Sequence, residues 1–189
     1  MTSDVWRGAL LFAPLFVGLA CHGLCIRFRL LRGLTRPIDR GVMWRGARLF
    51  GDNKTYRGIV AVALGSGLGF LLFGRSAASL QLPPMKIPAG IVTFVFGAAF
   101  GAAAMLSELP NSALKRQLGV GPGEQASGMR RAAFHVLDQV DVLIGGWLIL
   151  ATVVTPTMGL VLGSFLFVYV GHQLITLAGY ALGMRATSR

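Results

Sequence analysis

Charged residues are scarce in this chain of 189 residues, and acidic ones are the scarcest. Asp, Glu, Lys and Arg together make up 13% of the sequence, and only 7 residues are Asp or Glu against 18 Lys or Arg. A soluble domain carries roughly a quarter charged residues, whereas 54% of this chain is hydrophobic and 26 residues are Gly. The composition therefore argues against an ordinary soluble domain and predicts an all-α polytopic membrane protein.

Two further absences narrow the chemistry that the chain can carry. Its two cysteines, Cys21 and Cys25, have no metal-ligand spacing around them, so we expect packed, reduced thiols. The sequence also lacks the spacing of a Walker A phosphate-binding loop. A metal or phosphate site must therefore be built from other residues.

Long hydrophobic runs are what the sequence has in abundance. Several are long enough to cross a bilayer as a helix, which takes roughly 20 residues. We expect five spans, at about 5–26, 58–73, 88–106, 134–154 and 158–182. The two long polar loops between them cover 27–57 and 107–133. Closely spaced glycines in the second span permit the close approach of neighbouring helices.

The cations are distributed unevenly about these five spans. Fifteen of the 18 Lys and Arg residues lie in the two long loops or in the C-terminal tail, and three lie on the other side. Because cytoplasmic loops carry the excess of Lys and Arg, the N-terminus is predicted outside and the C-terminus in the cytoplasm. Cations that flank membrane spans in this way argue against a nucleic-acid-binding face.

The acidic residues gather on the same predicted cytoplasmic side. Asp4 is the exception, and the other six lie on or near that side: Asp39, Asp52, Glu108, Glu124, Asp138 and Asp141. On this topology the second, third and fourth spans bring cations and carboxylates to one end of the membrane. There they can meet in a single site.

Asp138 and Asp141 lie three residues apart where the fourth span begins, so they share one face of a helix. One interpretation is a polar helix start, with Asp138 at the positive end of the helix dipole. The other is a metal site, because a carboxylate at membrane depth needs a partner or a metal. Mg²⁺ commonly binds through one or two carboxylates plus substrate phosphates.

Two segments could bring phosphates to this pair. Lys54 and Arg57 would share a face where the second span begins, and helix-start amides with two cations favour an anion. Lys115 and Arg116 lie in the other long loop, between Glu108 and a Gly-Pro-Gly turn. The alternative is that these cations only mark the ends of spans by snorkelling. The order of cations, turn and paired aspartates fits metal-assisted transfer that involves a nucleotide.

Three blocks carry a resemblance to a known family. They are Gly51-Asp52-Asn53-Lys54-Thr55-Tyr56-Arg57-Gly58, then Asn111-Ser112-Ala113-Leu114-Lys115-Arg116 with Gly119-Val120-Gly121-Pro122-Gly123, and finally Asp138-Gln139-Val140-Asp141. Together they resemble the CDP-archaeol synthase family, related to the CDP-diacylglycerol synthases, whose signature has Ser-x-x-Lys-Arg, a Pro-Gly turn and Asp-x-x-Asp in this order. Pro37-Ile38-Asp39-Arg40-Gly41 is similar to that family's first cytoplasmic loop.

This resemblance implies a single transmembrane catalytic domain, 1–189, that faces the cytoplasm from the cell membrane. It would convert CTP and a phosphorylated glycerolipid to a CDP-lipid and pyrophosphate with Mg²⁺. The implied catalytic residues are Asp138, Asp141 and Lys115, with both aspartates as metal ligands and Glu108 as a further candidate ligand. The implied phosphate and CTP contacts are Asn53, Lys54, Thr55, Arg57, Asn111, Ser112, Arg116 and Gly123. A homodimer that encloses the lipid is a further expectation.

Other functions stay open on the sequence alone. A CDP-alcohol phosphotransferase also uses Asp-x-x-Asp pairs and Mg²⁺, but its longer signature is absent. A small ion transporter would place carboxylates near the bilayer centre, whereas here they cluster at one end of the spans. A structural membrane protein is the remaining alternative. His135 lies three residues before Asp138 and could share its face, whereas His22 and His172 are more typical of interhelical hydrogen-bonding groups. All three are left out of the site.

Overall fold

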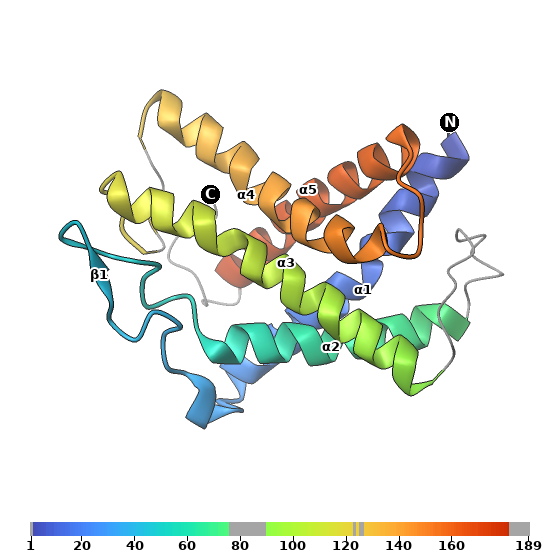
Figure 1. Cartoon of the computed structure of the whole chain (residues 1–189), viewed down its shortest axis with the longest axis horizontal. Helices are drawn as coiled ribbons and strands as arrows, with labels where there is room; N and C mark the ends of the chain where they lie inside the picture. The colour runs from blue at the N-terminus through green and yellow to red at the C-terminus, as the bar shows by residue number, and fades with distance from the viewer. Residues whose placement is uncertain (1, 76–89, 123, 125–126, 182–189) are drawn as a thin grey trace.

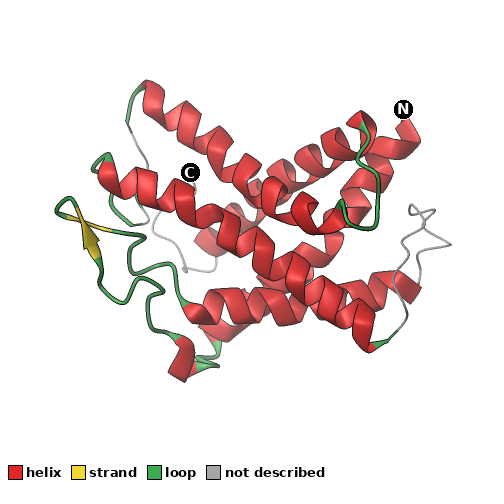
Figure 2. Ribbon diagram, viewed as in Figure 1, coloured by secondary structure: helices red, strands yellow, loops and turns green. Residues whose placement is uncertain are grey.

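Five long α-helices make up the chain in the computed structural model, which describes residues 2–75, 90–122, 124 and 127–181 (Figures 1 and 2). The helices are α1 (Thr2–Arg27), α2 (Tyr56–Arg75), α3 (Ile91–Gln117), α4 (Met129–Leu150) and α5 (Met158–Ala181). Each contains a stretch long and apolar enough to cross a membrane. The structure therefore confirms the predicted all-α fold with five transmembrane helices.

The loop between α1 and α2 contains the remaining secondary structure of the described residues. A short 3-10 helix, η1 (Arg32–Leu34), is followed by an antiparallel hairpin of β1 (Met43–Trp44) and β2 (Ala47–Arg48). Figure 1 shows this loop beyond the start of α2 and beside the end of α3. The N-terminus and the α4–α5 turn lie at the opposite end of the bundle (Figure 1).

The helices pack in the order α5, α1, α2, α3, α4, and contact between α4 and α5 is sparse. Glycine makes the closest of these contacts possible, because a Cβ at Gly65 of α2 would overlap Gly18 and Cys21 of α1. A Cβ at Gly101 of α3 would likewise overlap Ser66 of α2. These contacts confirm the close helix approach predicted from the glycine content.

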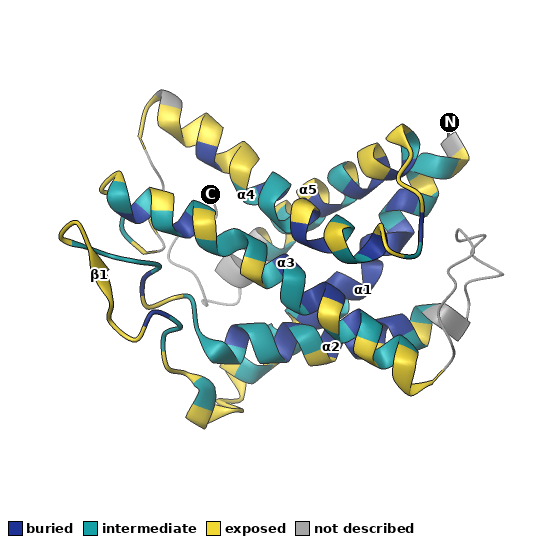
Figure 3. Cartoon of the chain, viewed as in Figure 1, coloured by how far each residue is buried: buried dark blue, intermediate teal, exposed yellow. Residues whose placement is uncertain are grey.

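Aromatic rings fill the centre, where α1, α2 and α3 meet. Phe100 lies with its ring centre 5.3 Å from those of Phe12 and Phe70, both edge-on, and Phe12 and Phe100 are fully buried. Such edge-to-face pairs stabilise packing beyond the area that they bury. Large apolar side chains such as Leu72, Leu148 and Leu174 are instead exposed. Figure 3 shows exposed positions along all five helices. An extensive apolar exterior is what a surface in contact with lipid requires.

The boundaries around the second long loop differ from the prediction. Residues 107–133 were expected to form a loop, but α3 continues to Gln117 and α4 already begins at Met129. Pro110 lies inside α3, where it removes one helical hydrogen bond, yet the following residues Ala113 to Gln117 are mostly good helix formers. The polar character of this segment reflects the end of a long helix that leaves the membrane.

The other predicted spans differ less from the observed helices. Helix α2 extends the predicted second span by two residues at each end, and α4 ends at Leu150, four residues before the predicted limit. The expected start of the third span at Pro88 and the end of the fifth at Leu182 lie outside the described residues.

Candidate active site

A single amide side chain on α3 connects the two aspartates of α4. The Nδ2 of Asn111 donates to Asp138 Oδ1 at 2.7 Å and to Asp141 Oδ2 at 2.9 Å. Lys115 lies one helical turn further along α3, and its Nζ donates to the same Asp138 oxygen at 2.5 Å. The same Nζ is 5.3 Å from the ring centre of the buried Phe134. The structure thus brings together four of the residues that the sequence analysis proposed for the site.

A second ion pair lies beside this cluster. Lys54, just before α2, donates to the carboxylate of Glu108 on α3, and both side chains are largely buried. Glu108 lies three residues before Asn111 on α3, so this ion pair is about one helical turn from the contacts of Asn111 with the aspartates. Helix α3 therefore carries both groups of polar contacts.

Asp39 fixes the loop that carries Lys54. Its buried carboxylate accepts hydrogen bonds from Arg48 Nη2 at 2.6 Å and from the backbone N–H groups of Phe50 and Gly51 at 3.0 Å each. Burial alone would raise the pKa of Asp39, but these hydrogen bonds outweigh it and hold that pKa well below its usual range. The backbone N–H of Ile38 in turn donates to the carbonyl of Lys54 at 2.8 Å.

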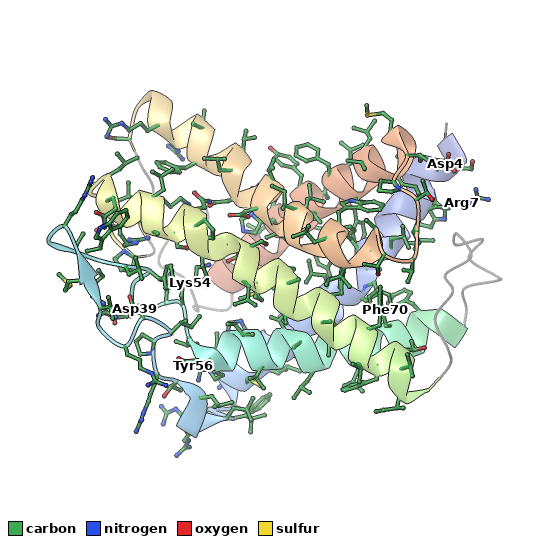
Figure 4. All side chains as sticks on the ribbon, viewed as in Figure 1. Asp4, Arg7, Asp39, Lys54, Tyr56 and Phe70 are labelled. Atoms are coloured by element: carbon green, nitrogen blue, oxygen red, sulfur yellow. The ribbon has the colours of Figure 1, made fainter. Side chains whose placement is uncertain are left out.

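This hydrogen-bond network shows that the Pro37–Gly41 block stabilises the loop between α1 and α2. Sequence reasoning did not include Asp39 among the site residues, and the only signal for it was the resemblance of its loop to the family's first cytoplasmic loop. The buried carboxylate stabilises the backbone on both sides of the hairpin. It thereby helps to position Lys54 next to Glu108 of α3. At this end of the bundle Figure 4 shows Asp39, Lys54 and Tyr56, with Asp4 and Arg7 at the other.

The remaining residues predicted near α2 have different surroundings. Thr55 caps the helix, because its Oγ1 accepts a hydrogen bond from the Gly58 N–H at 3.3 Å. Arg57 lies in the first turn with its Nε buried and without a hydrogen-bond partner among the described residues. Asn53 is exposed in the preceding loop. Gly123 lies outside the described residues.

Arg116 points away from the aspartates. It is buried, and its Nη1 donates to the carbonyl oxygen of Val120 in the turn that ends α3. Adjacent residues on a helix are rotated by about 100° from each other, so Lys115 and Arg116 face different neighbours. Ser112 is also buried within α3. The structure therefore ties Arg116 to the fold of the turn, and its contact with phosphates stays a prediction.

The donor set fits Mg²⁺. Two carboxylates on one helix face share a single amide, and the Oδ1 of Asn111 is buried without a hydrogen-bond partner in the described part of the chain. Across the described ranges, no three His, Cys, Asp or Glu side chains are grouped so that they could enclose a metal. A site with two hard oxygen ligands suits Mg²⁺, which usually keeps waters and substrate phosphates as its other ligands.

The comparison with known proteins decides the family. A family model described as CarS-like, CDP-archaeol synthase, matches residues 8–188. The chain belongs to the CDP-archaeol synthase family. It is 35% identical over 163 residues to the CDP-archaeol synthase of Halorubrum lacusprofundi, covering 82% of this chain and 84% of that protein. It is 33% identical over 162 residues to the CDP-archaeol synthase of Halobacterium salinarum.

A solved structure supports the fold independently. It is described as an intramembrane enzyme for archaeal membrane lipid biosynthesis, and it superposes with a TM-score of 0.62 at 24% sequence identity. The match covers 89% of this chain and 91% of that one. Because CDP-archaeol synthases are membrane cytidylyltransferases, membership in the family confirms the predicted class of enzyme and does not support the transporter, structural and CDP-alcohol phosphotransferase alternatives.

Proposed function

We propose that the chain transfers the cytidylyl group of CTP to a phosphorylated glycerolipid at the cytoplasmic end of the bundle, with Mg²⁺. One observation carries this proposal: Asn111 and Lys115 of α3 converge on Asp138 and Asp141 of α4. Two carboxylates and a cation in contact can hold a metal and a polyphosphate side by side. The names of the relatives support an archaeol-type lipid as the acceptor.

Each of the four residues has a separate task in this proposal. Asp138 and Asp141 would hold Mg²⁺, which neutralises charge on the CTP phosphates when it is bound. Asn111 orients both carboxylates through its two hydrogen bonds. Lys115 stabilises the negative charge on the phosphate oxygens in the transition state. Glu108, once a candidate ligand, is assigned to Lys54, with which it pairs.

The bond changes require little further chemistry from the protein. An oxygen of the lipid phosphate forms a bond to the α-phosphorus of CTP. The bond from that phosphorus to the pyrophosphate oxygen breaks, and the electron pair leaves with pyrophosphate. Because the second pKa of a phosphate monoester is about 6, the attacking oxygen is already ionised at neutral pH and no residue has to remove its proton.

Location and assembly follow as separate proposals. The distribution of Lys and Arg supports a cell-membrane protein with the N-terminus outside and the site on the cytoplasmic side, where CTP is found. A homodimer that encloses the lipid stays a prediction, and the mass of the purified protein in detergent would test it.

The direct test is synthesis of CDP-lipid by the purified protein in detergent. Given labelled CTP, Mg²⁺ and a panel of ether- and ester-linked lipid phosphates, it should release pyrophosphate and form a labelled lipid. Asp141→Asn should lower turnover on the order of 100-fold or more, because it weakens the metal and phosphate site. Asp52→Asn is the matched control, since Asp52 is exposed and pairs only with Arg48 among the described residues.

Two outcomes would contradict this proposal. Absence of product with every lipid phosphate would remove the activity itself. Full activity of Asp141→Asn, in a protein that unfolds at the same temperature as the unchanged chain, would remove the metal role of the aspartates.

A further inference from the structure

His22 of α1 lies at the edge of the site, although it was not among the predicted site residues. Its imidazole packs against Gly58 in the first turn of α2, where a Cβ would lie 3.5 Å from both Cε1 and Nε2. The same Cβ would lie 3.6 Å from the Cε of Met105 on α3, about one helical turn before Glu108. Helix α1 therefore brings a polar group to a site otherwise formed by α2, α3 and α4.

The two cations near His22 differ in their ion-pair and hydrogen-bond partners. Lys54 is paired with Glu108, whereas Arg57 makes no ion pair with any described residue. The Arg57 Nε is buried and has no hydrogen-bond partner in the part of the chain that the structure describes. A buried guanidinium N–H without an acceptor is unfavourable, because it has lost its hydrogen bonds to water. An anion from outside the chain would satisfy it.

We propose that His22, Arg57 and Lys54 form the subsite for the phosphate of the lipid substrate, with His22 as a hydrogen-bond donor from α1. This inference rests on the proposed cytidylyl transfer. The proposed function places CTP at the Asp138–Asp141 pair of α4, so a second anion site on α1 and α2 is assigned to the other substrate, the lipid phosphate.

Helix α3 connects this subsite to the aspartates. Its Met105 lies beside Gly58, as His22 does, and its Glu108 pairs with Lys54. Its Asn111 donates to both aspartates. A lipid phosphate held by His22 and Arg57 would thus be connected through α3 to a nucleotide held at the Asp138–Asp141 pair. Two separate anion sites keep two negatively charged substrates apart until the attacking oxygen approaches.

Substrate kinetics of His22 variants test this assignment. His22→Leu should raise the KM for the lipid phosphate about tenfold, the effect of losing one hydrogen bond to a charged group. The KM for CTP and the Mg²⁺ requirement should not change. His22→Gln, whose side-chain amide N–H can replace the imidazole donor, should recover most of the affinity. Cys25→Ser is the control, because Cys25 is a half-buried residue one turn further along the same helix.

A measurement without CTP or Mg²⁺ separates this inference from the proposed function. The midpoint of thermal unfolding in detergent should rise when a lipid phosphate is added, and the rise should be smaller for His22→Leu than for Cys25→Ser. If the unchanged chain makes CDP-lipid while His22→Leu alters both KM values equally or neither, the subsite is wrong and the function stands. If no CDP-lipid forms at all, the proposed function fails, whatever the binding result.

Discussion

At the scale of single residues, two adjacent cations show what a motif can and cannot predict. The Lys-Arg pair at 115 and 116 predicted two phosphate contacts, but the two side chains have different partners in the structure. Lys115 reaches Asp138, whereas Arg116 turns toward the carbonyl of Val120. The sequence shows that a cation is present, but the rotation between neighbouring positions of a helix decides which of them faces the site.

Substitution of the two cations by methionine should separate their roles. Arg116→Met keeps the apolar stem but removes the hydrogen bond to Val120, so it should lower the midpoint of thermal unfolding by several degrees without changing the KM for CTP. Lys115→Met should instead lower turnover by about 100-fold or more, with little change in that midpoint. Unfolding curves in detergent and steady-state kinetics on both variants would distinguish the structural role of Arg116 from the catalytic role of Lys115. A raised KM for CTP with unchanged stability in Arg116→Met would support its predicted phosphate role.

At the scale of helices and strands, hydropathy predicted which segments cross the membrane but not where the helices end. All five spans were located from apolar length, since a helix in lipid has to satisfy its own backbone. Helix α3 leaves the apolar region and continues to Gln117, and the polar residues of this extension hold Asn111 and Lys115 at helical spacing. A hydropathy profile contains no signal for a helix beyond the membrane.

The hairpin between α1 and α2 was not predicted from the sequence, for a different reason. Its strands are two residues long, too short for an alternating pattern. Its turn uses Arg45 and Gly46 at positive φ values of 51° and 81°. Gly often occupies such a turn, but Arg does so rarely and therefore gives no local signal. The buried Asp39–Arg48 contact stabilises this loop, and that contact joins residues nine apart in the sequence.

The packing contact between α3 and α4 should control activity, so an apolar substitution at that contact should be enough to lower it. A Cβ at Gly145 of α4 would overlap the carbonyl oxygen of Ala103 and the Oγ of Ser107 on α3. Gly145→Leu should therefore push α4 from α3 and separate Asp138 and Asp141 from their α3 partners. A displacement of about 1 Å at a reacting centre can lower the rate on the order of 100-fold.

Ile144→Leu is the matched control for this packing contact, because Ile144 is the preceding residue and is exposed on the outer surface. It should retain activity, while Gly145→Leu should reach the membrane in similar amounts but synthesise little CDP-lipid. Turnover per mole of purified protein is the measurement. Normal turnover in Gly145→Leu would show that the approach of these two helices is not what positions the aspartates.

At the scale of the whole molecule, the polar residues are distributed unequally between the two ends of the five-helix bundle. Asp39 and Lys54 lie at one end, with Asp4 and Arg7 at the other (Figure 4). Five spans would place the two termini on opposite sides of the membrane, as the distribution of Lys and Arg predicts. The net charge of +11 is concentrated in the loops at the end that holds the site. This unequal distribution of positive charge is therefore relevant both to the orientation of the chain in the membrane and to the binding of negatively charged substrates.

Thiol labelling in intact cells tests that orientation on the whole chain. Ser127, between α3 and α4, and Thr155, between α4 and α5, are both exposed, and they lie at opposite ends of the bundle. In a background with Cys21 and Cys25 changed to Ala, Thr155→Cys should react with a membrane-impermeant thiol reagent added outside, and Ser127→Cys should not. Both should react after the cells are permeabilised, which controls for accessibility. The reverse pattern would put the aspartates on the side without CTP, and the proposed reaction could not take place there.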